Sequence, residues 1–273
     1  MLACVLACFL APPETALTTD EIMARVARNQ DAAGEARARY VYKQDVLARL
    51  MKGGGKLSRE EKREYTVAPT PKGVTKTLAN FQGRYERDGK LHAYDKPGFK
   101  YKGADIDGDL IDFLANDLVN DKHSKDGLET DLFPLKAAKF GKYNFTLLES
   151  KTYRGRAAHR IRFEPKDKKD FDWKGEAWID AEEYQPVVIV SQFSRGLPAA
   201  VKILLGTNIK QLGFTIEYTR VAPGVWLPVS YGTEFYVRAV FFYARTIALA
   251  LKSSDFRETD VSSAISYHTP PTP

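Results

Sequence analysis

The chain has 273 residues, 44% hydrophobic and 28% charged, which excludes wholesale disorder and leaves enough apolar material for a sizeable core. Its formal net charge is +6, but runs such as Arg59–Glu64 and Lys166–Asp170 interleave the two signs. Interleaved charges are typical of solvated faces and turns, so we expect no nucleic-acid partner, although the basic excess suits peripheral contact with anionic lipid head groups. Both cysteines, Cys4 and Cys8, lie near the N-terminus, which leaves the folded body without a disulfide, a zinc–thiolate site or a cysteine nucleophile.

Residues 1–16 resemble a truncated secretory signal peptide. Met1–Leu10 is a short apolar run followed by small residues and prolines typical of a cleavage region, although the usual basic start is missing. We therefore expect export to the periplasm. Cys8 is a weak match to a lipid-attachment site with little apolar chain before it, so lipid anchoring is the less favoured alternative. Arg238 and Arg245 interrupt the most apolar later tract, and each costs about 2.5–3.5 kcal/mol at a bilayer centre, so no membrane span is expected there.

A capped helix is predicted at the start of the folded domain. Thr18 and Glu21 form a capping box, and an apolar stripe from Ile22 to Val26 continues the helix to about Gly34. Alternating residues then predict strands at Arg39–Met51, Arg63–Thr70 and Gly73–Gln82, followed by a small hairpin over Tyr85–Tyr94 that turns at Asp88-Gly89.

The pattern becomes helical between about residues 104 and 141. Leucine and isoleucine recur at helical spacing from Leu110 to Leu118, and Asp107 or Asp109 can cap the start of this helix. A second short helix is predicted over Leu132–Lys139, before a glycine. We interpret this segment as a helical insertion that, together with the first helix, covers one face of a sheet.

From Tyr143 the period of two returns, and the Lys174–Val190 hairpin is its clearest example. A tryptophan strand, a polar turn at Glu182-Glu183 and a valine-rich return are typical of an antiparallel pair. Residues 17–260 therefore predict one α+β domain, a large curved antiparallel sheet with a helical lid, for which a closed barrel is the alternative; residues 261–273 predict a loose tail. Further strands are predicted at Asn144–Thr152, Arg156–Glu164, Lys202–Gly206, Gly213–Val221, Val225–Tyr231, Phe235–Ala244 and Ile247–Ser253.

Motifs for catalysis or cofactor binding are missing from the sequence. It contains no glycine-rich nucleotide loop and no zinc-protease motif, and its four histidines, His92, His123, His159 and His268, are isolated. Asp105–Asp109 resembles the start of a calcium loop, but the loop's glycine and final glutamate are absent, so helix capping is preferred. The Glu182-Glu183 pair is interpreted as a solubilising turn. We therefore predict no metal, no cofactor and no enzymatic activity.

Aromatic and aliphatic residues are abundant on the predicted strands. Val187–Val190 and Ala239–Tyr243 carry apolar residues on both strand faces, so these strands need cover on each side. A few short helices can cover only part of so wide a sheet, which leaves an apolar concavity of a size that soluble proteins seldom expose. An acyl chain is a plausible occupant, since a 16-carbon tail contributes on the order of 10 kcal/mol when fully buried.

Three short segments carry a resemblance to a known family. Gly175–Asp180 (Gly-Glu-Ala-Trp-Ile-Asp), Tyr184–Val188 (Tyr-Gln-Pro-Val-Val) and Gly224–Pro228 (Gly-Val-Trp-Leu-Pro) resemble the LolA/LolB-like superfamily of periplasmic lipoprotein carriers and outer-membrane lipoprotein-sorting proteins. The resemblance implies a half-open antiparallel β-barrel with helices as a lid, which binds acyl chains between them and has no catalytic residues or metal. It does not define the cargo, and the long charged segment Pro97–Lys142 departs from the family pattern.

The sequence therefore predicts a non-enzymatic, monomeric periplasmic carrier or chaperone for a lipid or lipoprotein acyl chain. Because strand parity is open, the opposite strand face can replace most of the predicted lining residues by their neighbours. One alternative is a sensor or interaction module that binds an envelope protein; another is a hydrolase or isomerase, which requires at least two of His92, His159, Asp180 and Glu217 to converge. The candidate lipid-binding residues are Trp178, Phe193, Phe214, Ile216, Tyr218, Phe235 and Phe241.

Overall fold

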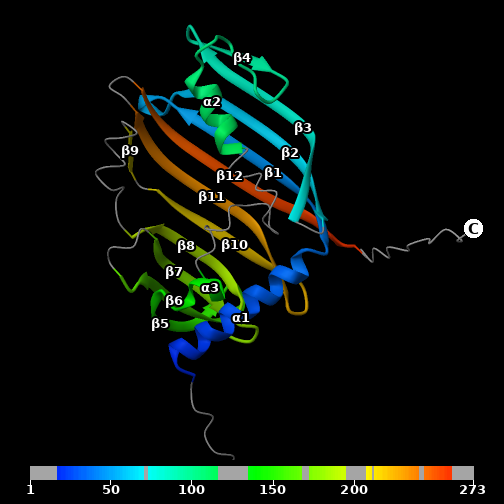
Figure 1. The fold of residues 1–273 in the computed structure, drawn as a ribbon, viewed down its shortest axis with the longest axis vertical. Coiled ribbons are helices and arrows are strands. Elements are labelled where there is room, and N and C mark those ends of the chain that lie inside the picture. The colour runs from blue at the N-terminus through cyan, green and yellow to red at the C-terminus, as the bar shows by residue number, and fades with distance from the viewer. Residues whose placement is uncertain are drawn as a thin grey trace, which may run out of the picture.

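The computed structural model describes residues 17–70, 73–115, 135–167, 172–194, 207–210, 212–239 and 243–259. These residues form one antiparallel sheet of twelve strands with three α-helices and a short 3₁₀ turn at Gly53–Gly55 (Figure 1). The helices are α1 (Thr19–Arg37), α2 (Ile106–Phe113) and α3 (Ala137–Phe140). The strands are β1 (Tyr40–Met51), β2 (Leu57–Thr70), β3 (Gly73–Arg87), β4 (Lys90–Tyr94), β5 (Tyr143–Tyr153), β6 (Arg156–Pro165), β7 (Trp173–Asp180), β8 (Pro186–Phe193), β9 (Thr207–Lys210), β10 (Gly213–Ala222), β11 (Val225–Ala239) and β12 (Tyr243–Glu258).

The strand order is β4-β3-β2-β1-β12-β11-β10-β8-β7-β6-β5, and β9 pairs with β11 beside this path. All the pairings are antiparallel, and the first and last strands, β1 and β12, lie side by side in the middle of the sheet (Figure 1). Strands β4 and β5 are the two ends of the order, so the described part of the sheet is open. The predicted curved antiparallel sheet with few helices is confirmed, and the closed barrel is not observed.

Some of the predicted turns and strand boundaries agree with the structure and others do not. The Asp88-Gly89 turn is confirmed, since both residues have the positive φ of a tight hairpin turn. Strand β11, in contrast, continues through Gly232, where the sequence predicted two strands, because Gly232 pairs with Thr215 on one side and Ala250 on the other. The predictions for residues 1–16, 202–206 and 261–273, and for Leu118 and His123, lie outside the described residues.

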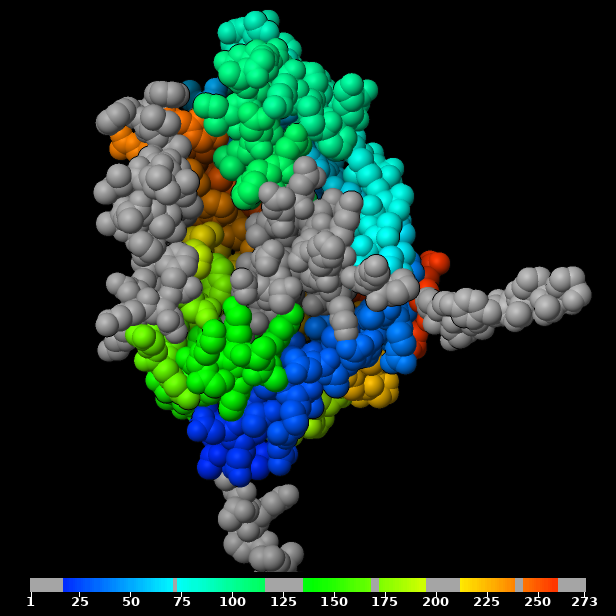
Figure 2. Space-filling model, viewed as in Figure 1, coloured from blue at the N-terminus to red at the C-terminus, as the bar shows by residue number. Residues whose placement is uncertain are grey.

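Helix α1 packs through apolar contacts and two amide hydrogen bonds. Thr18 and Glu21 form the predicted capping box, and Ile22, Met23 and Val26 are buried in the core. On the same helix, Asn29 donates to the backbone oxygen of Glu183 at 2.8 Å, and Gln30 donates to Gln185 at 2.6 Å. The helix lies over one face of the sheet, where it packs against β11 and β5 (Figures 1 and 2).

Helix α2 lies on the same face, where it buries Ile111 in the core and is also held by charged groups. Its cap is Asp105 rather than the predicted Asp107 or Asp109, and the Asp105 carboxylate accepts both from Gly108 N and from Arg59 Nη1, the latter at 2.6 Å. Asp107 accepts from Tyr243 at 2.7 Å and from Arg245 at 3.1 Å. Capping, not a calcium loop, is therefore the observed role of this acidic segment.

The charged run Arg59–Glu64 is not a solvated face, which corrects the interpretation from the sequence. The run lies in β2, where alternate side chains point to opposite faces, and Arg59, Glu61 and Arg63 face the helices. Arg59 and Glu61 are each only 1% exposed, and Tyr94 joins them by accepting from Arg59 at 2.8 Å and donating to Glu61 at 2.7 Å. Buried charges of this kind need partners, and here each has one.

Removing Asp105 should therefore weaken the fold. We expect Asp105→Ala to lower the free energy of unfolding by about 3–5 kcal/mol, because it leaves the buried Arg59 guanidinium without its carboxylate. Asp109→Ala on the same helix is the matched control: its pair with Lys100 is solvent-exposed, and its loss should cost less than about 1 kcal/mol. Urea unfolding of the two variants measures the difference, and equal losses would contradict the buried pair.

Two strand glycines should respond oppositely to alanine. A Cβ on Gly175 would lie 1.9 Å from the Val190 carbonyl oxygen, whereas a Cβ on Gly232 meets no atom within 4 Å. Gly175→Ala should cost about 3 kcal/mol through overpacking. Gly232→Ala should be neutral or stabilise by about 0.5–1 kcal/mol, since alanine loses less conformational freedom in a strand. Thermal unfolding compares the two, and a Gly175→Ala protein as stable as the parent would refute the close approach.

Candidate binding site

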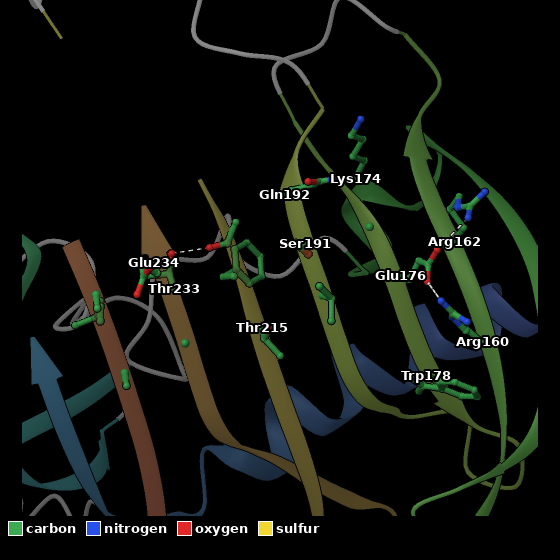
Figure 3. A pocket seen from close by; sticks show the side chains of 18 of the residues that line it. Arg160, Arg162, Lys174, Glu176, Trp178, Ser191, Gln192, Thr215, Thr233 and Glu234 are labelled. Carbon is green, nitrogen blue, oxygen red and sulfur yellow. Dashed lines mark hydrogen bonds and ion pairs between the residues drawn. The ribbon is translucent and has the colours of Figure 1, made fainter. Parts of the chain in front are cut away.

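An open groove of about 1230 Å³ crosses the sheet from β1 to β6 (Figure 3). It lies on the face that points away from the helices, and α1 is seen behind the strands in this view (Figure 3). Its walls come from seven strands, so no single hairpin forms it. The groove exists because β12 joins the N-terminal strands to the C-terminal ones.

The floor of the groove is one row of small and aliphatic side chains. Leu47 pairs with Ala250, Ala250 with Gly232, Gly232 with Thr215, and Thr215 with Val190, so the five residues follow one another across five strands. At the usual strand spacing this row is about 19 Å long. Val190 is 51% exposed, which is unusual for a large aliphatic side chain in the middle of a strand.

Gly232 is the residue that keeps the floor open. Its backbone does not have the positive φ that favours glycine, and no neighbouring atom excludes a Cβ. A glycine that neither a turn nor packing requires is a weak strand residue, and such glycines often mark places where a ligand approaches the backbone. The one sequence signal for this site is a glycine inside a run of strand residues. The predicted strands end at Tyr231 and begin again at Phe235, so the prediction places Gly232 between two strands.

The row ends at β7 and β6 in charged side chains. Glu176 pairs with Val190 in register and accepts from Arg160 at 2.8 Å and from Arg162 at 3.0 Å (Figure 3). Partial burial acts to raise the pKa of Glu176, but the two guanidinium groups outweigh it and hold that pKa below its usual value. Lys174 and Gln192, paired across β7 and β8, complete this end of the groove.

At the opposite end, Arg49 of β1 lines the groove, and its charge is compensated by Glu60. Glu60 is buried and bonds to Arg49 at 2.6 Å and to Arg84 at 2.9 Å. Glu234 lies on the neighbouring part of the wall (Figure 3). The groove therefore has an apolar middle and polar ends.

The residues predicted to bind lipid lie on two different faces of the sheet, because alternate residues of a strand point to opposite sides. Trp178 lines the groove and stacks on Tyr153 with ring centroids 4.3 Å apart. Phe214 only borders the groove: its side chain is 4% exposed and lies in the core, on the same strand face as Ile216. Phe193 stacks on Trp173 at 4.1 Å. Ile216, Tyr218 and Phe235 are buried in the core, and Phe241 lies outside the described residues.

The groove is formed instead mainly by the neighbours of those residues, such as Thr215, Gln192 and Glu234. Sequence reasoning left this inversion open, because a one-residue shift moves a whole strand to its other face.

Within the described part of the chain, none of the four residues proposed for a hydrolase bonds to another, and only His159 and Asp180 lie on neighbouring strands, close enough for their charges to interact. His92 of β4 stacks on Tyr85 of β3, and Glu217 of β10 forms an ion pair with Arg154 at 2.7 Å. His159 shares a hydrogen bond of 2.8 Å with Ser150, and burial lowers its pKa. Asp180 is fully buried at the end of β7. Among the described residues there is also no group of three or more His, Cys, Asp or Glu side chains placed to hold a metal ion.

The segments that carry the family resemblance meet at the turn between β7 and β8. Trp226 donates to Glu183 at 2.7 Å, and Arg220 pairs with the same carboxylate at 2.6 Å. Glu183 is thus an anchor between β10, β11 and the β7–β8 turn, which corrects its interpretation as a merely solubilising residue. Gln185 of the same segment bonds to Gln30, so the turn also seats α1. Trp226 and Gln185 thus have a structural role away from the groove's apolar row, whereas Glu176 and Trp178 of the same segments line the groove.

Comparison with known proteins found similarity in structure but not in sequence. No protein-family model matches the chain, and no curated protein matches it. The structure is similar to an outer membrane lipoprotein-sorting protein domain from Vibrio parahaemolyticus, with a TM-score of 0.37, 10% identity, and 89% of this chain and 95% of that chain covered.

Two further solved structures are similar at comparable levels. A LolA superfamily protein from Nitrosomonas europaea gives a TM-score of 0.34 and 12% identity over 90% of this chain and 96% of that one. A DUF1329 family protein from Desulfovibrio piger gives a TM-score of 0.31 and 12% identity over 88% of this chain and 95% of that one. Within the described residues, no helix has the length and apolar character needed to cross a bilayer.

The buried Asp180 carboxylate should make stability depend on pH. Burial acts to raise its pKa, but Arg156 and the backbone N–H groups of Glu183 and Glu182 outweigh this and hold the pKa below its usual value. A lowered folded-state pKa contributes stability above the unfolded value of about 4, and that stability is lost as the pH falls through the folded value.

Asp180→Asn should therefore unfold more easily than the parent at pH 7, and the difference should shrink below about pH 4. Urea unfolding at pH 7, 5 and 3 measures it. A loss of the same size at all three pH values would show that the Asp180 charge is not the cause.

Proposed function

We propose that the chain is a non-enzymatic carrier or chaperone that binds the acyl chain of a lipid or lipoprotein in the cross-strand groove. The observation that supports this most directly is the apolar row from Leu47 to Val190, which stays open at Gly232. Its length of about 19 Å is comparable to one leaflet of a bilayer's hydrocarbon core, about 15 Å. A linear tail therefore suits the groove better than a compact ligand.

The groove's openness suits reversible binding. One side of a tail in the groove contacts protein and the other remains accessible, so roughly half of its methylene groups lose contact with water. For a 16-carbon tail this gives about 6 kcal/mol at about 0.8 kcal/mol per methylene. Such a free energy corresponds to a dissociation constant between about 1 mM and 1 μM. A carrier needs affinity in this range because it must also release its cargo.

The periplasm is the proposed location, and this rests on the signal-like residues 1–16 together with the resemblance of the motif segments. The binding mode differs from the one that the resemblance implies. Acyl chains were expected between the sheet and the helices, but the helix-facing side chains of the central strands, such as Ile216 and Leu249, are buried in the core. The proposed site is therefore on the other face.

Gly232→Leu tests the proposal. The new side chain would occupy the middle of the apolar row, and because nothing lies within 4 Å of the added Cβ, the fold should be retained. We expect the affinity for a fluorescent 16-carbon fatty acid, measured by titration, to fall at least tenfold. Thr152→Leu, which adds the same side chain at an exposed position of β5 outside the groove, should bind as the parent does.

Two results would overturn the proposal. One is a Gly232→Leu protein that is folded and binds the fatty acid as well as the parent. The other is a parent protein, exported to the periplasm, that yields no lipid on organic extraction and does not bind the fluorescent fatty acid. That second result would favour an interaction module for an envelope protein, which needs no lipid.

A further inference from the structure

The groove is polar at its ends, and its two ends are not equivalent. At the β1 end, the buried Glu60 is shared between Arg49 and Arg84, so its charge is already compensated by short contacts. At the β6–β7 end, Arg162 is 49% exposed and uses only Nη2 to bond to Glu176, which Arg160 also holds. The remaining N–H groups of Arg162 bond to no other described residue and can bind a ligand.

Lys174 adds a second available cation at the same end. Among the described residues it makes no hydrogen bond or ion pair, although it lines the groove beside Gln192 (Figure 3). Of the described residues that line this end, Glu164 alone carries an uncompensated negative charge, since Glu176 is already held by two arginines. The five ionisable side chains at this end, Arg160, Arg162, Lys174, Glu164 and Glu176, carry a formal charge of +1, and their unused hydrogen-bonding groups are mainly donors.

We propose that this end of the groove binds the anionic head of an amphiphile, a carboxylate or a phosphate, whose tail lies along the apolar row toward Leu47. The inference rests on the proposed function, because it uses the same groove. It adds an orientation and a ligand class: Lys174 and Arg162 contact the head, and Thr215, Gly232 and Ala250 contact the tail. A guanidinium and an ammonium beside an apolar floor fit such a molecule in both charge and polarity.

Opposite substitutions at the charged end test this orientation. Lys174→Gln combined with Arg162→Gln should weaken the binding of palmitate about tenfold and leave the binding of the neutral 16-carbon alcohol unchanged. Glu164→Gln should strengthen palmitate binding about threefold, again with no effect on the alcohol. All three side chains lie at the groove rim, and Glu176 keeps Arg160 as its partner in the double variant. Higher salt should weaken palmitate binding and not alcohol binding.

A 16-carbon lysophosphatidylglycerol distinguishes the two kinds of head. If it responds to the double variant more than palmitate does, the head is a phosphate; the reverse order identifies a carboxylate. Equal affinities of parent and double variant for palmitate would overturn the inference.

The Gly232→Leu protein separates this inference from the proposed function. If Gly232→Leu weakens the binding of all three ligands while the double variant changes none, the groove binds tails and only the head assignment fails. If Gly232→Leu also has no effect, the groove itself is refuted.

Discussion

Strands β1 and β12 pair over eleven residue positions from Tyr40 to Met51, and this pairing holds the rest of the sheet together. It joins residues that are about 200 positions apart in the chain, and it connects the strands β2, β3 and β4 to the strands β11, β10 and β8. Such a distant contact is costly in loop-closure entropy, so the two halves of the sheet depend on a long registered interface rather than on a few contacts. The groove crosses this junction, and therefore exists only in the complete sheet.

The two larger helices are attached to that sheet by different physical means. Helix α1 buries an apolar stripe, which is insensitive to salt and to pH near neutrality. Helix α2 also buries one apolar side chain, Ile111, but it adds Asp105 and Asp107, which bond to arginines and to Tyr243. Buried ion pairs contribute little net stability compared with apolar packing, but they tolerate only one arrangement. The ionic contacts thus fix where α2 sits, and the apolar contacts of α1 supply more of the free energy.

Sequence periodicity could predict the sheet because alternation over ten or more residues is a strong local signal. It predicted most strands for that reason, while the Thr18 cap and the Asp88-Gly89 turn followed from short local motifs. It could not assign faces, since a period of two defines two sets of residues without saying which set meets the helices. Trp178 and Ile216 were grouped on this basis, and the register places them on opposite faces.

The mixed charges of β2 failed to indicate burial for a related reason. Arg63 pairs with Glu61 in the same strand, but the groups that bury this charged run, Tyr94 in β4 and Asp105 at the cap of α2, are more than 30 residues from Arg59 and give no local sequence signal.

The position of the groove follows from which residues occupy the face of the sheet that the helices leave uncovered. Helices cover one face, and the other must either be polar throughout or leave an apolar strip exposed to water. Here ion pairs cover the β5–β7 region, as at Arg160, Glu149 and Glu176, while the middle strands carry glycine, alanine and threonine. Small residues limit the exposed apolar area, which protects the protein from aggregation, and they also leave a depression that larger residues would fill. In the proposed function, the same choice of residues serves solubility when the groove is empty and shape complementarity when a tail lies in it, and the charged end would define the direction in which that tail points.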